Sequence, residues 1–215
     1  SDLTAVALAA ALKAHRCEIY TDVEGIYTAD PRVVPQARKI RELSYEEMLE
    51  LAAYGAKMQP RSIELGAVYN VPIYVASSFV DSPGTLIHGG VNTMELRKKV
   101  TGIAYDLNVA KISVLGVPDR PGIAAALFEP LAQVSISVDT IVQNSSVDGL
   151  TDLSFTVTRT DLRRALEVVK KVAKEIGARG VTSDDTLSKV SIVGAGMQNA
   201  PGYASRMFRT LANAG

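Results

Sequence analysis

Short apolar stretches recur through the first 90 residues, each ending in turn residues. Residues 18–21, Glu-Ile-Tyr-Thr, contain the β-branched and aromatic side chains that strands favour, and Glu24-Gly25 and Asp30-Pro31 interrupt the chain after them. Residues 71–76 and 84–88 have the same character. We therefore predict three short strands in this part of the chain.

Helices are predicted between these strands. Ser1 or Asp2 can cap an alanine-rich helix that runs to residue 14, because a short side-chain oxygen accepts from free backbone amides. Ser44 and Glu47 have the spacing of a capping box and predict a helix to about Ala53, and Pro60 suits the first turn of the next helix. Strands that alternate with helices favour an α/β arrangement with a largely parallel sheet.

Beyond a polar and basic linker at 91–99, the pattern changes. After a leading strand at 100–105, six elements follow in the order strand, helix, strand, strand, helix, strand. They are predicted at 110–117, 122–133, 136–142, 151–158, 161–176 and 179–183. Apolar and polar residues already alternate at 134–138, which predicts a strand there. Apart from the leading strand, this is the βαββαβ order of a ferredoxin-like fold.

One short pattern occurs twice. The first copy is Lys111-Ile-Ser-Val-Leu-Gly116 with Pro121-Gly122 and Phe128, and the second is Lys189-Val-Ser-Ile-Val-Gly194 with Pro201-Gly202 and Phe208. Each copy predicts a strand, a loop and a helix. The second copy stops after its helix and the chain begins without an initiator Met, so we expect a fragment that holds one complete and one incomplete module.

Composition narrows the classes of function. Lys plus Arg and Asp plus Glu number 23 each, so no field of one sign exists to attract nucleic acid or an anionic membrane. The longest apolar run, residues 5–12, is far shorter than the roughly 20 residues that cross a bilayer. A single cysteine, Cys17, and no Cys/His cluster with metal-ligand spacing indicate a cytoplasmic protein with no protein-bound metal.

The start of the helix after Pro121-Gly122 has free backbone amides, which attract a carboxylate. The ammonium group of a free amino acid would find partners in nearby acidic and amide side chains. Alternatively, Pro-Gly only begins the helix tightly, although its recurrence at Pro201-Gly202 favours binding. The effector-binding candidates are Gly122, Ile123 and Ala124, with Asp119, Gln143 and Asn144 opposite.

The loop at residues 21–32, TDVEGIYTADPR, follows a strand at its carboxyl end, where α/β sheets place ligands. Its arginine can bind phosphate oxygens through two parallel hydrogen bonds, and its tyrosine can flank a purine. An ordinary turn is the alternative interpretation. No Gly-x-x-x-x-Gly-Lys-Ser/Thr motif is present, and Gly194-Ala-Gly196 lacks the third glycine of a dinucleotide fingerprint, which disfavours an oxidoreductase.

Several separated motifs resemble the aspartate kinase family with two ACT modules. They are Ser1-Asp2-Leu-Thr-Ala5, the 21–32 loop, Gly55-Ala-Lys57, Ser82-Pro-Gly-Thr85 and Val142-Gln-Asn144. The resemblance implies part of a three-layer α/β domain of the amino acid kinase type at 1–90. After the linker, it implies tandem ferredoxin-like ACT domains at 100–183 and 184–215, the second incomplete, with 100–105 as an alternative first strand of the second.

Members of this family transfer the γ-phosphoryl group of ATP to the side-chain carboxylate of L-aspartate. The resemblance implies that Mg²⁺ accompanies ATP, that Asp2 and Lys57 are catalytic, and that Ser1 contacts aspartate. The nucleotide-binding residues that it implies are Thr21, Asp22, Tyr27, Asp30, Arg32 and Lys57. A carboxylate is already ionised at neutral pH, so no general base is needed, and positioning with positive charge suffices.

The resemblance also implies inhibition by threonine or lysine and an assembly of identical chains, or of catalytic and regulatory subunits, through the ACT domains. The segment from Lys57 to Arg61 is one residue shorter than is usual in the family, which affects the register of Lys57. The alternative function is a regulatory subunit without catalysis that begins at Met94.

Overall fold

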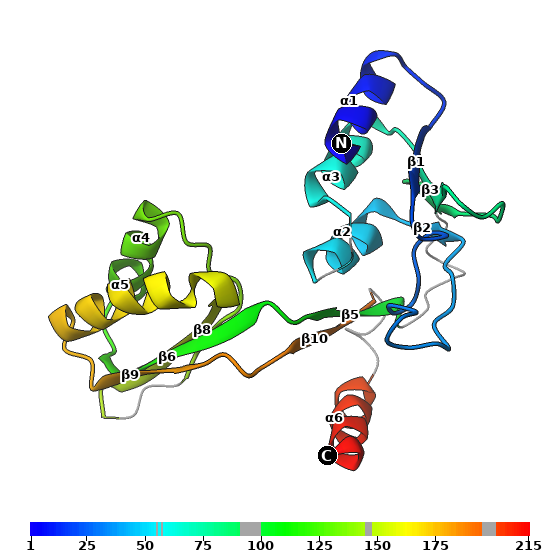
Figure 1. Cartoon of the computed structure of the whole chain (residues 1–215). Helices are drawn as coiled ribbons and strands as arrows, with labels where there is room; N and C mark the ends of the chain where they lie inside the picture. The colour runs from blue at the N-terminus through cyan, green and yellow to red at the C-terminus, as the bar shows by residue number, and fades with distance from the viewer. Residues whose placement is uncertain (55, 57, 91–99, 145–147, 195–200) are drawn as a thin grey trace. The chain divides into compact units, whose positions relative to one another are not determined.

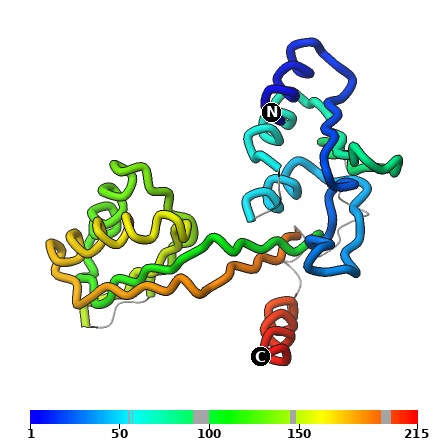
Figure 2. The backbone as a smooth tube through the Cα atoms, viewed as in Figure 1, coloured from blue at the N-terminus to red at the C-terminus, as the bar shows by residue number. Residues whose placement is uncertain are grey.

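The computed structural model describes residues 1–54, 56, 58–90, 100–144, 148–194 and 201–215. The chain divides into two compact units, which can be followed by colour in Figure 1 and Figure 2. The first unit combines Ser1–Tyr105 with Val190–Gly215, and the second unit is Asp106–Lys189. The two ends of the sequence therefore belong to the same unit.

The first unit contains a four-stranded sheet with the order β1-β3-β4-β2. Its strands are β1 (Cys17–Thr21), β2 (Glu42–Leu43), β3 (Ile73–Ser77) and β4 (Thr85–Ile87). β1 pairs with β3 and β2 pairs with β4 in parallel, whereas β3 and β4 are antiparallel. The sheet is therefore mixed, because the short connection from β3 to β4 permits only an antiparallel pair.

Three helices accompany this sheet: α1 (Asp2–Ala11), α2 (Tyr45–Ala53) and α3 (Pro60–Tyr69). The predicted capping box is confirmed, with Ser44 Oγ accepting from Glu47 N at 3.1 Å and Glu47 Oε2 accepting from Ser44 N at 3.2 Å. Ser1 is the N-cap of α1, but its hydroxyl donates to Asp2 Oδ1 instead of accepting from a helix amide. No helix in the described ranges is long and apolar enough to span a membrane.

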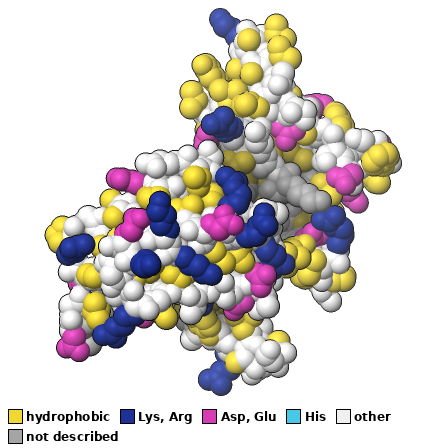
Figure 3. Space-filling model, turned by 60° about the vertical axis from the view of Figure 1, so that its left-hand side comes forward, with side chains coloured by type: hydrophobic (Ala, Val, Ile, Leu, Met, Phe, Trp, Pro, Cys, Tyr) yellow, Lys and Arg dark blue, Asp and Glu magenta, His cyan; other side chains and the backbone are white. Residues whose placement is uncertain are grey.

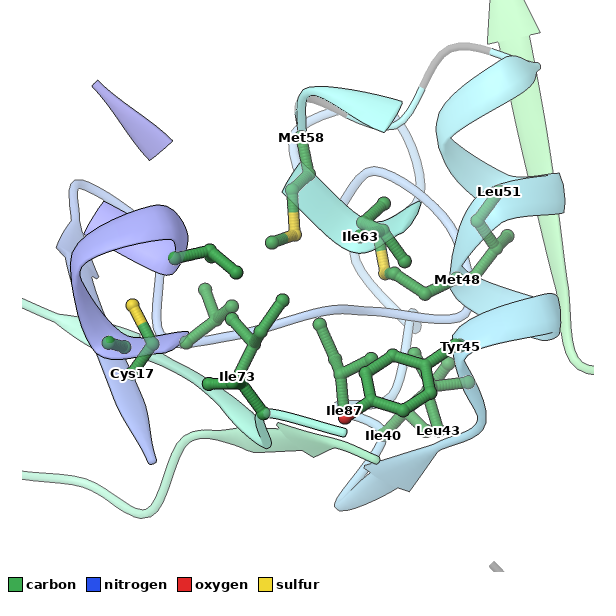
Figure 4. Packing of buried hydrophobic residues seen from close by; sticks show 14 of the residues in the cluster. Cys17, Ile40, Leu43, Tyr45, Met48, Leu51, Met58, Ile63, Ile73 and Ile87 are labelled. Carbon is green, nitrogen blue, oxygen red and sulfur yellow. The ribbon is translucent and has the colours of Figure 1, made fainter. Parts of the chain in front are cut away.

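Helices and sheet of the first unit share one apolar core. Met48 of α2 and Ile63 of α3 are completely buried, as are Ile73 of β3 and Ile87 of β4. Figure 4 shows these side chains between the helices and the strands. This packing holds the carboxyl ends of β1 and β3 together at one edge of the sheet.

The second unit has the predicted βαββαβ order. Its elements are β6 (Val109–Pro118), α4 (Ile123–Gln133), β7 (Ile141–Gln143), β8 (Leu150–Thr158), α5 (Leu162–Glu175) and β9 (Gly180–Asp184). The sheet has the order β7-β8-β6-β9, and every neighbouring pair is antiparallel. This topology confirms the ferredoxin-like prediction.

The prediction of a strand at 134–138 is wrong, and of the strand predicted at 136–142 only the end is present, as β7. Ser135 has a positive φ of 57°, and its backbone N donates to Ala132 O at 2.9 Å. Ile136 N donates to Leu131 O at 3.0 Å. These amides close the last turn of α4, so they are not available to a strand, and the alternation of apolar positions there reflects burial of Ile136 in the helix core.

Charged side chains of both signs cover the helix α5. Ala165, Val169, Val172 and Ala173 are buried on its inner side, while its lysines and arginines lie outside. Figure 3 shows Lys and Arg interspersed with Asp and Glu on the face of the molecule in view. The basic side of α5 is thus a solvated helix face.

The two copies of the sequence repeat have the same local geometry. Gly122 before α4 and Gly202 before α6 (Tyr203–Ala214) have φ values of 86° and 99°, a conformation that costs least for glycine. The strand of the second copy, β10 (Lys189–Val193), pairs with β5 (Gly102–Asp106). The second unit therefore lies in sequence between two strands that pair with each other.

Thr85 at the start of β4 holds both ends of the segment that follows β1. Its side chain is fully buried, and Oγ1 accepts from Ile26 N at 2.8 Å and donates to Ile40 O at 2.5 Å. Gly25, with φ of 141°, lies directly against it, since an added Cβ would be 2.6 Å from Thr85 Oγ1. One hydroxyl thus joins Ile26 and Ile40 at the base of the ribbon that carries the tip of the 21–32 loop.

Replacement of Thr85 by valine keeps the shape of the side chain and removes both hydrogen bonds. The substitution leaves a buried amide and a buried carbonyl unpaired, so we expect the free energy of unfolding to fall by about 2–4 kcal/mol. All 8 tyrosines lie in the first unit, so tyrosine fluorescence in urea measures this unit alone. Thr85→Ser, which keeps the hydroxyl, serves as control, and equal losses in the two variants would contradict the assignment.

Candidate functional site

The 21–32 loop begins at the carboxyl end of two neighbouring parallel strands. Thr21 is the last residue of β1 and lies in register with Ser77, the last residue of β3. Thr21 O accepts from Ser78 N at 2.8 Å, so the chain segments that leave both strands are joined at their first step. The loop thus lies at the carboxyl end of parallel strands, as the sequence predicted, and the binding of a ligand there stays a prediction.

The loop is a closed ribbon. Thr28 N donates to Arg38 O at 2.9 Å, and Thr28 Oγ1 accepts from Arg38 N at 3.0 Å. Tyr27 forms an isolated antiparallel bridge with Lys39. The two arms of the ribbon therefore hold each other in register, and the tip that carries Asp30 and Arg32 is defined.

Asp30 and Arg32 form a bidentate ion pair at this tip. Arg32 Nε donates to Asp30 Oδ1 at 3.0 Å and Nη2 donates to Oδ2 at 2.7 Å, and Arg32 N also donates to Oδ1 at 3.0 Å. These hydrogen bonds hold the pKa of the Asp30 carboxyl well below its usual range. The same pair raises the pKa of Arg32. Asp30 is thus the anchor of the arginine, and Arg32 is the side chain that reaches solvent.

A second charged group at this edge was not identified from the sequence. Lys39 Nζ donates to Glu24 Oε2 at 3.1 Å and to Ser82 Oγ at 3.2 Å, and Ser82 Oγ donates to Glu24 Oε2 at 2.8 Å. Hydrogen bonds from Ser82 and Lys39 lower the pKa of Glu24. The three residues are far apart in sequence; Glu24 lies in the 21–32 loop and Ser82 in the motif Ser82-Pro-Gly-Thr85, but nothing in the sequence indicated Lys39.

A shallow recess of about 350 Å³ lies beside the loop, at the end of β3. It is lined by Tyr20, Tyr74, Ala76 and residues 77–82. Hydroxyl groups and three aromatic rings, those of Tyr20, Tyr74 and Phe79, therefore border the same edge of the sheet as Thr21 and Asp22. Asp22 is exposed and accepts from Thr21 Oγ1 at 3.1 Å.

The residues expected to act on aspartate and phosphate are only partly described. Ser1 and Asp2 lie at the start of α1, and neither side chain hydrogen-bonds to the 21–32 loop. Asp2 contributes to the raised pKa of Cys17 at the start of β1, after the larger effect of burial. Lys57 lies outside the described residues, so its expected place at the phosphates is untested.

Among the effector candidates, the structure brings several to one end of the second unit's sheet. Asp119 N donates to Gly149 O at 2.8 Å just before β8, and Asn144 N donates to Asp152 O at 3.2 Å on the other side of β8. β6 and β7 flank β8, so Asp119 and Asn144 lie two strand spacings apart across the sheet, and their partners Gly149 and Asp152 are also separated along the chain.

The remaining candidates differ in accessibility. Gln143 ends β7 and is exposed, whereas Ile123 is buried and packs in the core. Gly122 and Ala124 lie at the amino end of α4, where Gly122 is the N-cap. Asn144 also lines a recess of about 600 Å³ together with Gly116, Asp152 and Arg179. The candidate surface is therefore polar and open, and Ile123 supports it from inside.

Models of two kinds of protein domain match separate parts of the chain. The sequence model of the amino acid kinase family matches residues 1–77, and models of the ACT domain match residues 111–177 and 190–215. The aspartokinase of Pseudomonas aeruginosa is 50% identical over 214 residues, which is 99% of this chain and 52% of that protein. The chain spans about half the length of the curated relatives it matches.

Solved structures agree. Escherichia coli aspartokinase III in complex with aspartate and ADP is 30% identical with a TM-score of 0.79, covering 98% of this chain and 47% of that one. The same enzyme with lysine and aspartate gives a TM-score of 0.73 over 98% of this chain and 46% of that one, at 30% identity. The regulatory subunit of aspartate kinase from Thermus thermophilus is 40% identical with a TM-score of 0.50, covering 54% of this chain and 76% of that subunit. Sequence, domain order and fold thus converge: this chain belongs to the aspartate kinase family.

Proposed function

We propose that this chain is the nucleotide-binding part and the regulatory region of an aspartate kinase. The enzyme transfers the γ-phosphoryl group of ATP to the side-chain carboxylate of L-aspartate and forms 4-phospho-L-aspartate, the first step toward lysine, threonine and methionine. The observation that carries the proposal is the 21–32 loop at the shared end of β1 and β3, in a chain half identical to an aspartokinase over nearly its whole length. The chain alone is not expected to turn over substrate.

The chemistry needs little from the protein beyond position and charge. The aspartate acceptor is ionised at neutral pH, so its oxygen attacks without a general base. The attacking carboxylate and the leaving ADP lie in line, and cations stabilise the charge on the transferred phosphoryl oxygens. In our proposal, Arg32 and Lys57 supply positive charge, and Tyr27, Thr21 and Asp22 line the nucleotide site.

The other assigned residues complete this site. Asp2 organises the reacting phosphate, and Ser1 contacts aspartate. Mg²⁺ would enter with ATP and would neutralise part of the charge on its phosphates, as expected where an enzyme binds Mg²⁺ chiefly through substrate phosphates. Cys17, a buried free thiol, suits a reducing cytoplasm.

The ACT region is proposed to bind an end-product amino acid and to join chains in the assembled enzyme. Lysine is the first candidate, since a related enzyme was solved with lysine, and threonine is the second. The proposed binding surface combines Asp119, Gly122, Ala124, Gln143 and Asn144. The proposed boundaries are 91–99 for the linker, 100–183 for the first ACT module and 184–215 for the second. Pairing of β5 with β10 supports residues 100–105 as part of the second module.

A regulatory subunit that begins at Met94 is the alternative, and the match to the Thermus thermophilus subunit favours it for the second half of the chain. Met94 lies outside the described residues. The amino acid kinase match at residues 1–77 favours the complete kinase instead. Calorimetry on residues from 94 onward, within a completed ACT region, separates the two, since an independent regulatory subunit binds lysine or threonine and not ATP.

The direct test is the full-length protein that contains this chain. Incubated with ATP, Mg²⁺ and aspartate, it is expected to form aspartyl phosphate, detected as the hydroxamate. No product with aspartate, when the purified protein is folded, rules the function out.

Arg32→Ala in the full-length enzyme is expected to raise the KM for ATP about tenfold, because a phosphate loses a charge-assisted hydrogen bond. The KM for aspartate is expected to stay unchanged. Arg163→Ala, on the exposed face of α5, is the matched control. Equal KM values for ATP in both variants would remove Arg32 from the nucleotide site.

Gln143→Ala is expected to raise the effector concentration for half-inhibition about tenfold and to leave uninhibited turnover unchanged, because the effector acts by favouring one global state. Titration with lysine, threonine and both together measures this and identifies the inhibitor. The control is Gln133→Ala, an exposed glutamine at the end of α4. A parallel loss of basal activity and sensitivity would show that Gln143 does not act through an effector site.

A further inference from the structure

The strand β5 is attached to the loop that carries the proposed nucleotide site. Ile103 N in β5 donates to Thr28 O at 2.7 Å, in the middle of the 21–32 loop. One residue before β5, Thr101 Oγ1 donates to Glu47 Oε1 at 2.7 Å, and Glu47 is also part of the capping box of α2. Two separate hydrogen bonds therefore join the β5 segment to the 21–32 loop and to the first turn of α2.

A third hydrogen bond leads from β5 to the ion pair. Tyr105 Oη donates to Asp30 Oδ2 at 3.2 Å. Asp30 Oδ2 also accepts from Arg32 Nη2, and Oδ1 accepts from Arg32 N and Nε. Each carboxylate oxygen thus has two donors, which fixes the rotation of the Asp30 carboxylate and, with it, the plane of the guanidinium.

The ion pair leaves Arg32 able to bind a ligand. A guanidinium has five N–H donors, and Asp30 accepts from two of them. The side chain of Arg32 is 62% exposed, whereas that of Asp30 is only 17% exposed. The remaining donors of Arg32 therefore point away from its anchor, in a direction set by Asp30 and Tyr105.

The same strand pairs with the carboxyl-terminal copy of the repeat. β5 pairs with β10, and Thr101 N donates to Val193 O at 2.7 Å. A displacement of β10 is therefore transmitted to β5 through main-chain hydrogen bonds. Tyr105 is the side chain by which such a displacement reaches Asp30.

We infer that Tyr105 is a positioning residue for the nucleotide site: it fixes Asp30, which orients Arg32 toward a phosphate of ATP, and it links the second ACT copy to nucleotide affinity. The inference rests on the proposed function only in assigning the 21–32 loop to the nucleotide. Tyr105 does not touch the reacting atoms. It acts on binding and leaves the chemical step to other groups.

The test uses the full-length enzyme with Tyr105→Phe, which removes one hydroxyl and keeps the ring. The KM for ATP and the dissociation constant for ADP, measured by calorimetry, are expected to rise about fivefold, as for loss of a hydrogen bond that supports a charged group. The values of kcat and of the KM for aspartate stay within twofold. Tyr69→Phe, an exposed tyrosine at the end of α3, is the matched control and changes neither constant.

A double-mutant cycle shows whether Tyr105 acts through Asp30. In the Asp30→Asn background, Tyr105→Phe is expected to add less than twofold to the dissociation constant for ADP, because the two residues form one chain of contacts. In the enzyme that keeps Asp30, a saturating inhibitor changes the KM for ATP by some factor, and Tyr105→Phe is expected to reduce that factor at least twofold. Full additivity of the two substitutions would overturn the inference, and so would an unchanged affinity for ADP.

The two proposals fail in different measurements. If the wild-type enzyme binds ADP but makes no aspartyl phosphate, the proposed reaction fails, and the ADP titrations still decide the role of Tyr105. If Tyr105→Phe lowers kcat and leaves nucleotide affinity intact, the positioning role fails and the proposed reaction stands.

Discussion

The hydroxyl group of Thr85 is the contact on which the geometry of the candidate site depends. It is completely buried, and it holds the backbone of Ile26 and of Ile40 together, at the base of the ribbon formed by the long segment between β1 and β2. A surface loop of this length has few apolar contacts of its own, and its entropy favours many arrangements. With both ends held by one buried side chain, the internal bonds of Thr28 suffice to shape the tip.

The tip then has a simple electrostatic design. Asp30 receives four hydrogen bonds, which stabilise its charged form and hold Arg32 in one orientation. Phosphoryl transfer to a carboxylate gains most from cations whose positions are set before the substrate binds, since no reorganisation is then needed in the transition state. In the proposed reaction, the half-buried Asp30 and the exposed Arg32 would meet that requirement.

The order of strands connects this site with the repeat. A complete ferredoxin-like unit is inserted between β5 and β10, and these two strands pair as part of the first unit. Because β5 also bonds to Thr28 and Asp30, the second copy of the repeat and the 21–32 loop both bond to this strand. The proposed regulation by a bound amino acid would act through this shared strand, since an effector changes affinity only through contacts that differ between two states.

The sequence by itself determined the local elements and the class of the second unit. The capping box at Ser44, the helix after Pro60 and the βαββαβ order are set by side chains within a few residues of each other, and hydrophobic periodicity reports burial directly. The repeated Pro-Gly also predicted two helix starts with one geometry. At 134–138 the same periodicity was misleading, because burial of Ile136 follows equally from a helix end and from a strand.

Tertiary structure alone decided which distant residues meet. Nothing in the spacing joins Lys39 to Glu24 and Ser82, or Tyr105 to Asp30, because these contacts depend on how β1, β3 and β5 are placed by the core around Ile73 and Met48. The sequence named Asp30 and Arg32 as ligand-binding candidates. Only the fold showed that one anchors the other, because the four donors to this carboxylate come from two segments, the 21–32 loop and β5, that the fold brings together.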